Sequence, residues 1–282
     1  MFSIVVVSWK NLPFLKTLIS SIQKNSVYTH HQLLIHVQEG CGETEQWLDS
    51  KKIQYTMSEN NIGLSAAANM AARKADQDFI CLIDDDMYVL PRWDKELINF
   101  VQLYGLERFW VVSTMLERAG QYTLKADFGN SLEKFNEADL LRKFEKYKNK
   151  LLPVINNSAL PGLISTQLWC DVGGYDEDFP VIGSDDGFAK RLWDYGCRDV
   201  GITVPRSLVY HFQAASTGRL HNLEGLQVER DDKFLAKYGM TLSHFQDQEL
   251  KKGRPWEGYS RSRSTSGKLI DGVRHFFTQR LE

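Results

Sequence analysis

Several features that mark common protein classes are missing from this chain of 282 residues. Its four cysteines (Cys41, Cys81, Cys170 and Cys197) form no C-x-x-C pair and show no zinc-ligand spacing, which fits reduced thiols better than a disulfide framework. No apolar run approaches the ~20 residues of a membrane-spanning helix. The opening stretch, MFSIVVVSWKN, lacks the charged region and long apolar core of a secretory signal. We therefore expect a soluble, cytoplasmic protein.

A strong excess of charge is also missing, because the formal net charge is −2. This balance does not favour a nucleic-acid partner. The charge is unevenly spread, however: Lys251–Glu282 holds eight basic and three acidic residues, and the remainder holds 26 and 33. A basic tail on an acidic body indicates an anionic partner, such as a lipid surface or a phosphorylated substrate. A solvated C-terminal helix is the plain alternative.

What the sequence does contain is a regular alternation of strand and helix patterns in its first half. Short, β-branched runs predict strands, and apolar residues at helical spacing predict helices. Units of this kind predict an α/β protein with a mixed, mostly parallel sheet flanked by helices, in a single main domain. The predicted strands are Phe2–Val7, Leu33–Val37, Ile53–Met57 and Phe79–Ile83, and the predicted helices are Pro13–Asn25, Thr44–Leu48 and Gly63–Lys74.

The second half is less regular. The pattern predicts a surface helix over residues 136–150 and a second helix from Asp185 that ends at Gly196. Two short strands are expected on either side of Pro205. The ranges expected here are a helix at Pro91–Tyr104, a strand at Phe109–Met115, and strands at Gly201–Val204 and Ser207–Tyr210.

Polar side chains follow three of the predicted strands. Ser8 and Trp9 follow the first, Glu39 follows the second, and the run Asp84–Asp86 follows the fourth. In open α/β sheets, ligands bind beyond the carboxyl ends of the strands. If the chain stays extended, Asp84 and Asp86 point one way and Asp85 the other. Two carboxylates on one side suit Mg²⁺ or Mn²⁺, which take oxygen ligands.

The order VVVSW, VQEG, NIGLSAAANMAARKA and FICLIDDD resembles the nucleotide-sugar-binding half of the inverting GT-A glycosyltransferases, family 2 in particular. Asn61, Gly63, Ala67 and Asn69 match the family's N-x-G-x-x-x-A-x-N helix start, and the aspartates match its D-x-D motif. The resemblance implies the Rossmann-like GT-A fold and a nucleoside-diphosphate sugar as donor, with UDP favoured. It spans roughly residues 2–211.

The second half extends the resemblance. LPGLISTQLWCDVGGYDEDF is similar to the family's acceptor-side segment, which implies that Gly162 and Trp169 contact the acceptor. GSDDGFAKRLWDYGC resembles the segment of the catalytic base. An ungapped alignment makes Asp185 the base and leaves Ser184 where the family commonly has Glu. A shift by one residue makes Asp186 the base instead.

The resemblance therefore implies a metal-dependent, inverting glycosyltransferase whose acceptor is a glycan, a lipid-linked sugar or a glycoconjugate. Retention of configuration stays open as the alternative, since some relatives with a metal-binding aspartate and a similar histidine retain it. Its expected parts are a donor half (1–115), an acceptor half with the base (116–215) and a C-terminal extension (216–282). The cofactor is Mn²⁺ or Mg²⁺, and His211 stands where the family often has a third metal ligand. The expected donor residues are Ser8, Trp9, Glu39, Asn61, Gly63, Asn69, Asp84 and Asp85, and the expected metal ligands are Asp84, Asp86 and His211.

Other protein classes fit less well. A non-catalytic scaffold that binds sugar nucleotides needs no base, whereas this chain carries Asp185 and Asp186. A nucleotidyltransferase requires a Gly-rich, basic loop after the first strand, and an NAD enzyme requires G-x-G-x-x-G there, but the chain has SWKNLPF. A haloacid-type phosphatase places its D-x-D at the first strand. For the basic tail, two roles stay open: closure over the active site, or attachment to the inner face of the membrane near a lipid-linked acceptor.

Overall fold

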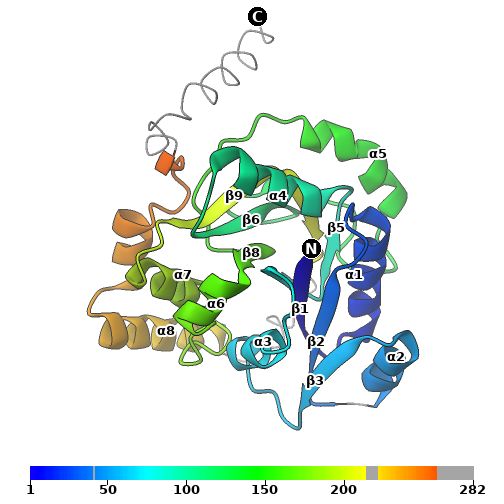
Figure 1. Ribbon diagram of the computed structural model, residues 1–282, viewed down its shortest axis with the longest axis horizontal. Coiled ribbons are helices and arrows are strands. Elements are labelled where there is room, and N and C mark those ends of the chain that lie inside the picture. The colour runs from blue at the N-terminus through cyan, green and yellow to red at the C-terminus, as the bar shows by residue number, and fades with distance from the viewer. Residues whose placement is uncertain (41, 214–221, 259–282) are drawn as a thin grey trace, which may run out of the picture.

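The computed structural model describes residues 1–40, 42–213 and 222–258, and its elements form one mixed sheet with helices around it (Figure 1). The order of the strands across the sheet is β3-β2-β1-β4-β8-β6-β9-β5, and β7 pairs with β6. The predicted α/β fold with a mixed, mostly parallel sheet is confirmed. The strands are β1 (Phe2–Trp9), β2 (Gln32–Gln38), β3 (Gln54–Ser58), β4 (Phe79–Asp84), β5 (Met87–Val89), β6 (Phe109–Glu117), β7 (Leu124–Lys125), β8 (Gly162–Ser165) and β9 (Asp199–His211).

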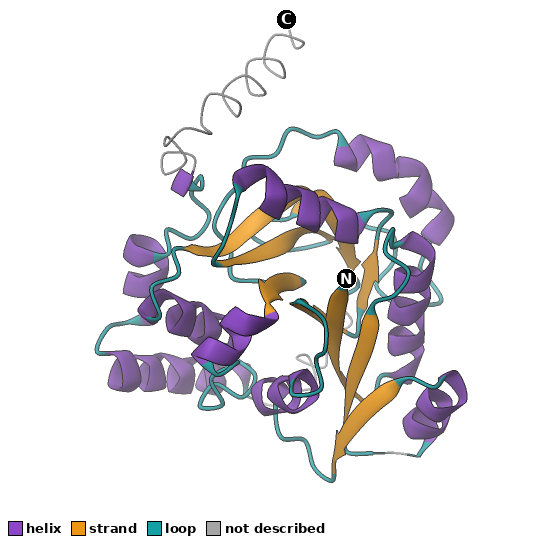
Figure 2. Ribbon diagram, viewed as in Figure 1, coloured by secondary structure: helices purple, strands orange, loops and turns teal. Residues whose placement is uncertain are grey.

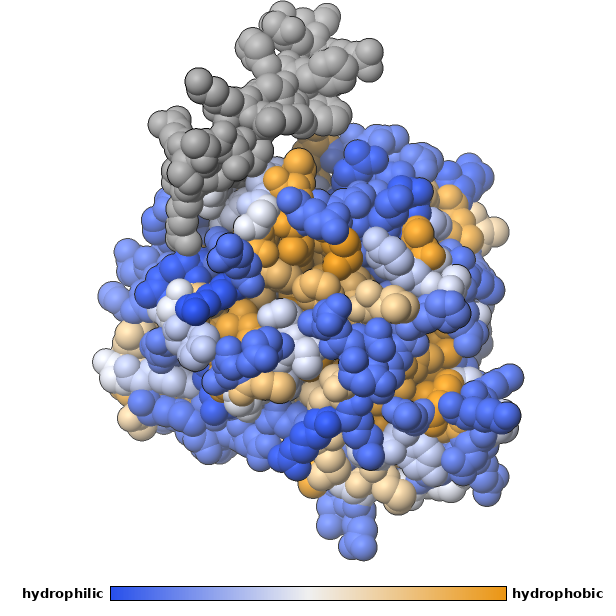
Figure 3. Space-filling view, viewed as in Figure 1, coloured by the Kyte–Doolittle hydropathy of each residue, from blue (hydrophilic) through white to orange (hydrophobic). Residues whose placement is uncertain are grey.

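Helices cover the sheet in the way that the strand–helix alternation predicts (Figure 2). Figure 3 shows a mostly hydrophilic outer face with apolar side chains gathered toward its middle. No helix among residues 1–40, 42–213 and 222–258 is long and apolar enough to cross a bilayer. The helices are α1 (Leu12–Asn25), α2 (Glu43–Lys51), α3 (Leu64–Ala72), α4 (Trp93–Tyr104), α5 (Glu137–Lys148), α6 (Thr166–Val172), α7 (Ser184–Asp194), α8 (Leu223–Tyr238) and α9 (Leu242–His244), and a π-helical stretch, η2 (Phe245–Glu249), follows α9.

The first four strands in the order all pair in parallel. Strands β2 and β4 flank β1, and both pair with it in parallel, so β1 is an interior strand of the sheet. Ile4, Val5 and Val6 are at most 1% exposed, as a continuous β-branched run predicts. This arrangement brings the carboxyl ends of β1, β2 and β4 to one edge of the sheet.

The second half of the sheet contains three antiparallel pairings. β8 pairs antiparallel with β4 and with β6, and β5 pairs antiparallel with β9. The two strands predicted around Pro205 are in fact one strand, β9, of 13 residues. Its pairing with β6 shifts register between Ser113 and Thr114, next to Pro205, whose missing N–H is tolerated at such an irregularity.

Part of the predicted C-terminal extension packs against the sheet half that precedes it. Phe234 in α8 and Phe245 are fully buried in the main core. At the end of α8, the Lys237 Nζ and Tyr238 hydroxyl groups donate to the two oxygens of Asp176, over 2.7 and 2.6 Å. These contacts join α8 to the segment before α7. Most of the basic tail, residues 259–282, lies outside the described residues.

Candidate active site

A cavity of about 430 Å³ opens at the carboxyl ends of β1, β2 and β4. Polar and aromatic side chains from the first half of the chain line one side of the cavity. The segment before α7 and the end of β9 form the opposite side. The sheet order explains this arrangement, because parallel strands end at the same edge. The lining residues are Val7, Trp9, Gln38, Asn61, Leu64, Asp84, Asp85, Asp86, Leu160, Val181, Ile182, Ser184, Asp185, His211 and Gln213.

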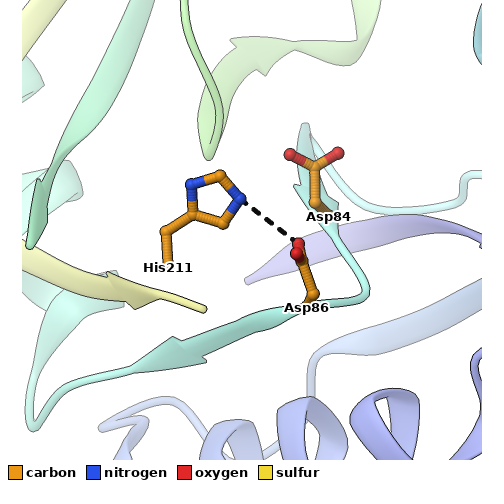
Figure 4. Close-up of side chains that lie close together, drawn as sticks. All are labelled: Asp84, Asp86 and His211. Atoms are coloured by element: carbon orange, nitrogen blue, oxygen red, sulfur yellow. Dashed lines mark ion pairs between the residues drawn. The ribbon is translucent and has the colours of Figure 1, made fainter. Parts of the chain in front are cut away.

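Three potential metal ligands meet at the floor of this cavity (Figure 4). Asp84 is the last residue of β4, and Asp86 follows in the turn that leads into β5. The antiparallel pairing of β5 with β9 sets Met87 opposite His211, which carries the imidazole next to Asp86. One ligand atom from each of Asp84, Asp86 and His211 lies within 4.8 Å of the others.

The electrostatics of this cluster favour positive charge between the carboxylates. Burial, followed by repulsion from Asp86, raises the pKa of Asp84 to about 7. Burial alone would lower the pKa of His211, but its hydrogen bonds with Asp86 and Glu117 raise it to about 10. A divalent ion would stabilise the charged carboxylates that burial disfavours. Two carboxylates and one imidazole form a donor set that fits a divalent cation such as Mn²⁺.

The Asp85 carboxylate is bonded away from these ligands because the chain turns after Asp84, so the extended backbone on which the alternation was predicted does not continue. Its two carboxylate oxygens accept hydrogen bonds from the Ser8 hydroxyl and the Asn11 side-chain amide, each over 2.8 Å. Burial and the neighbouring Asp86 raise the pKa of Asp85 to about 7, while these two bonds oppose the rise. Asp85 and Ser8 therefore hold the loop after β1 against the end of β4.

The two candidate bases have different surroundings. Asp185 lies in the first turn of α7 and lines the cavity, and its Oδ1 accepts a hydrogen bond of 2.9 Å from the Tyr175 hydroxyl. Burial raises the pKa of Asp185 to about 6. Asp186 is not part of the cavity lining. Its Oδ1 accepts hydrogen bonds from Ser158 (2.8 Å) and Gln246 (2.9 Å).

The donor-side residues are only partly at the cavity surface. Trp9 and Asn61 line it, whereas Glu39 forms an ion pair with Lys10 beside it. The contact with Lys10 lowers the pKa of Glu39. Gly63 has a φ of 83°, and a Cβ there would lie 2.7 Å from the Pro180 carbonyl oxygen. The start of α3 therefore requires glycine for close packing.

Three predicted residues lie away from this cavity. The Asn69 amide donates to the Tyr175 carbonyl and to Glu177, so it joins α3 to the Gly173-Gly174 turn region. At Gly162, the Trp110 indole occupies the space that a Cβ would need. Trp169 is 5% exposed and packs against Tyr175 and Phe188. For each of these residues the structure supplies a packing reason rather than a place in the cavity.

Several residues at the site could not be identified from the sequence. Glu117 contacts His211, and Tyr175 contacts Asp185. Gln38 and Gln213 line the cavity, and Asn11 bonds Asp85. Tyr175 lies within the GGYDE stretch of the acceptor-side resemblance, which was a usable signal. Glu117 had none, because 94 residues separate it from its partner His211.

Comparisons with known proteins agree with this geometry. Residues 3–114 match the family model described as Glycosyl transferase family 2. A curated relative, the O-antigen biosynthesis protein RfbC of Myxococcus xanthus, is 26% identical over 226 residues, which are 75% of this chain and 17% of RfbC.

Solved structures share the fold. The structure of S. aureus TarS 1–349 in complex with UDP superposes with a TM-score of 0.57 at 13% identity, covering 95% of this chain and 76% of that one. GalNAc-T7 with UDP, GalNAc and Mn²⁺ gives a TM-score of 0.54 at 14% identity, with coverages of 90% and 53%. The chain spans only 42% of the longer TarS structure. The match over residues 3–114 and the shared fold show that the chain is similar to the family 2 glycosyltransferases and has the GT-A fold.

Proposed function

We propose that this chain transfers a sugar from a nucleoside-diphosphate sugar, with UDP as the favoured nucleotide, to a hydroxyl group of a saccharide or lipid-linked acceptor. The observation that carries the proposal is the shared cavity: the ligand cluster Asp84, Asp86 and His211 lines the same hollow as Asp185. One wall suits a leaving diphosphate, and the other offers a base. The UDP complexes of TarS and GalNAc-T7 support a nucleotide donor.

The donor's diphosphate would lie over the cluster. Asp84, Asp86 and His211 would hold a divalent cation, Mn²⁺ or Mg²⁺, which supplies positive charge beside the diphosphate as the glycosidic bond breaks. The Mn²⁺ in the GalNAc-T7 structure supports this role. Trp9, Gln38 and Asn61 line the part of the cavity nearest to β1 and β2, where the nucleoside would lie.

Asp185 would act as the base. Its Oδ1 is held by the Tyr175 hydroxyl, so Oδ2 remains to accept the proton of the acceptor hydroxyl. The acceptor oxygen forms a bond to the anomeric carbon while the bond from that carbon to the diphosphate oxygen breaks. The proton moves to Asp185, and the diphosphate leaves with the electron pair. Attack opposite the leaving group inverts the anomeric carbon.

Asp185 is preferred over Asp186 as the base for a geometric reason. Asp186 is bonded to Ser158 and Gln246 and does not line the cavity, whereas Asp185 does. A scaffold that only binds sugar nucleotides is the second candidate. It would not need a buried carboxylate aimed at the cavity by a tyrosine.

The donor site is tested by a thermal-shift panel of UDP-, GDP-, dTDP- and CMP-linked sugars, each with Mn²⁺ and with EDTA. A ligand of the folded state raises the melting temperature according to its concentration over its dissociation constant. We expect a Mn²⁺-dependent shift with one nucleotide, and its loss in Asp86→Ala. The control is Asp171→Ala, which removes an exposed carboxylate on α6. No shift with any nucleotide would contradict the metal-dependent donor site.

The base is tested separately by turnover. Asp185→Asn should keep the donor-induced thermal shift and lose transfer by two or more orders of magnitude, as expected for removal of a general base. An active Asp185→Asn enzyme would contradict the assignment.

The role of the tail is tested by removing residues 259–282 and measuring turnover with and without anionic vesicles. Loss of turnover with a free acceptor favours closure over the site, and loss of turnover only with vesicles favours attachment to a membrane.

A further inference from the structure

A buried carboxylate lies behind the histidine of the proposed metal site. Glu117 is the last residue of β6 and is 5% exposed. Its Oε2 lies 2.9 Å from Nδ1 of His211 and accepts a second hydrogen bond of 3.2 Å from the Gln213 side-chain amide. His211 is the last residue of β9, and Gln213 follows shortly after it. The pairing of β6 with β9 brings both residues next to Glu117.

The two nitrogens of the His211 ring face different carboxylates. Nδ1 contacts Glu117, and Nε2 is directed toward Asp86 Oδ1 at 3.4 Å, on the side where Asp84 also lies (Figure 4). A carboxylate that accepts from Nδ1 fixes the proton on that nitrogen and leaves the Nε2 lone pair for a ligand. Metal-bound histidines commonly have a carboxylate or carbonyl in this position, and it also makes the ring a stronger donor.

We propose that Glu117 is a positioning residue of the cation site, which orients His211 so that Nε2 completes the ligand set with Asp84 and Asp86. This inference rests on the metal-dependent function proposed above. Glu117 does not belong to the cluster of atoms that could contact the ion. It acts on the ion through the orientation and basicity of the imidazole.

The surroundings of Glu117 hold its carboxylate in this orientation. The Gln213 side chain donates to Glu117 and to the Ala119 carbonyl, while its own oxygen accepts from the Ala119 amide over 3.3 Å. At Gly120, a Cβ would overlap Oε1 of Glu117, so the glycine in the loop after β6 leaves the space that this carboxylate occupies. The group is therefore preorganised by the protein, as a metal site's supporting contacts need to be.

A simpler interpretation is that the same contacts only form a buried hydrogen-bonded bridge between β6 and β9. The two readings differ in what the removal of Glu117 does. A bridge supports stability and leaves the intrinsic affinity for a cation unchanged. A positioning carboxylate affects cation affinity even where the fold is intact.

The test measures Mn²⁺ binding to the purified full chain by calorimetry or by loss of the free-ion EPR signal. In Glu117→Gln, the amide oxygen can still accept from Nδ1 but the charge is gone, and in Glu117→Ala both are gone. We expect affinity to fall about 10-fold or more, within the 10–100-fold range for such partners, and further in Glu117→Ala than in Glu117→Gln. Glu137→Gln is the matched control, because Glu137 likewise accepts a side-chain hydrogen bond, from the Tyr88 hydroxyl, but contacts no member of the ligand cluster.

Melting curves in EDTA show whether each variant is folded, and Glu117→Gln keeps the test valid if Glu117→Ala is not. Reduced stability of the folded Glu117→Gln protein with unchanged Mn²⁺ affinity would overturn the inference in favour of the bridge, while the metal site itself would stand. A wild-type chain that binds no Mn²⁺ would overturn both the inference and the proposed metal dependence.

Discussion

The three aspartates of the Asp84–Asp86 run face two different environments. Asp84 and Asp86 face the cavity and His211, whereas Asp85 is bonded to Ser8 and Asn11. Three adjacent carboxylates would repel one another strongly if they shared one pocket. Here the backbone turn separates the three carboxylates. Neutral hydrogen-bond donors stabilise Asp85, and the His211 imidazole stabilises Asp86. The remaining repulsion between Asp84 and Asp86 is what a cation would relieve.

The Tyr175 hydroxyl provides a prediction about the pH dependence of catalysis. A hydrogen bond to the ionised carboxylate lowers the pKa of Asp185, against burial, which raises it to about 6. Tyr175→Phe removes that bond, so the pKa of Asp185 should rise further. The base must be ionised to accept a proton. We therefore expect the acid limb of the kcat/KM profile, near pH 6 in the wild type, to move to higher pH in the variant.

The pH profile of kcat/KM distinguishes the loss of the Tyr175 hydrogen bond from a loss of packing. Tyr175 is also buried among Trp169 and Phe188, and the phenylalanine ring keeps those contacts. Activity of the variant should therefore recover at pH 8 relative to pH 6. An equal loss of activity at every pH would count against the hydrogen bond as the cause.

Gly162 supports a prediction about stability. The Trp110 indole fills the space next to its α-carbon, and Trp110 is fully buried. Gly162→Ala should lower the free energy of unfolding by about 1–3 kcal/mol, the usual cost of overpacking a core. Urea unfolding measures the loss. In a Trp110→Phe background the smaller ring leaves room, so the same substitution should cost less there; an equal cost in both backgrounds would show that Trp110 is not the obstacle.

At the scale of elements, strong local patterns were sufficient for most of the first half. β1 follows from a β-branched run, and α1 from a Pro start with apolar residues on one face. Short or composite elements were not predictable. β5 has three residues and exists because it pairs with β9, and β9 looks like two strands because Pro205 interrupts the pattern. In both cases the contacts that determine the strand join residues distant in sequence, so local propensity does not predict them.

The pairing of β2 with β3 supplies a prediction about pH and stability. His36 is fully buried on β2, and its ring contacts the hydroxyl groups of Thr56 (2.8 Å) and Ser58 (3.2 Å) on β3. Burial lowers the pKa of His36 to about 4 from its ordinary 6.5. The unfolded chain binds a proton at higher pH than the folded chain. The stability associated with a neutral His36 is therefore complete above about pH 6.5 and is lost as the pH falls toward 4.

The lowered pKa of His36 corresponds to a loss of roughly 3 kcal/mol at most in the free energy of unfolding, at about 1.4 kcal/mol per pKa unit. Urea unfolding at pH 7 and pH 4.5 checks it against His36→Gln, which has no proton to gain. The wild type should lose more stability than the variant over this interval. Parallel losses in the two proteins would show that other groups cause the acid sensitivity.

At the scale of the whole molecule, the site joins segments from both halves of the chain. The family resemblance placed Asp84, Asp86, His211 and Asp185, and the structure brings all four to one cavity. Physical reasoning from local sequence could not have done so, since β4 lies far from α7 and β9 in the chain. The same distance explains why Glu117 was not predicted. Its role depends on the register of β6 with β9, which only the folded sheet reveals.

The proposed binding of a cation to the ligand cluster would be coupled to the stability of the whole fold. Burial raises the pKa of Asp84 to about 7, and hydrogen bonds raise that of His211 to about 10, so both tend to hold protons in the metal-free protein at pH 6. A cation needs both groups deprotonated, and its binding must release those protons. Mn²⁺ should therefore raise the melting temperature more at pH 8 than at pH 6.

Melting curves with Mn²⁺ and with EDTA at the two pH values test this coupling. Asp84→Asn removes one of the protons to be released, so the remaining Mn²⁺ shift should be smaller and should depend less on pH. Asp171→Ala, on the exposed surface of α6, should behave as the wild type. A Mn²⁺ shift that is larger at pH 6, or that Asp84→Asn leaves unchanged, would mean that the cation stabilises the fold from some other place.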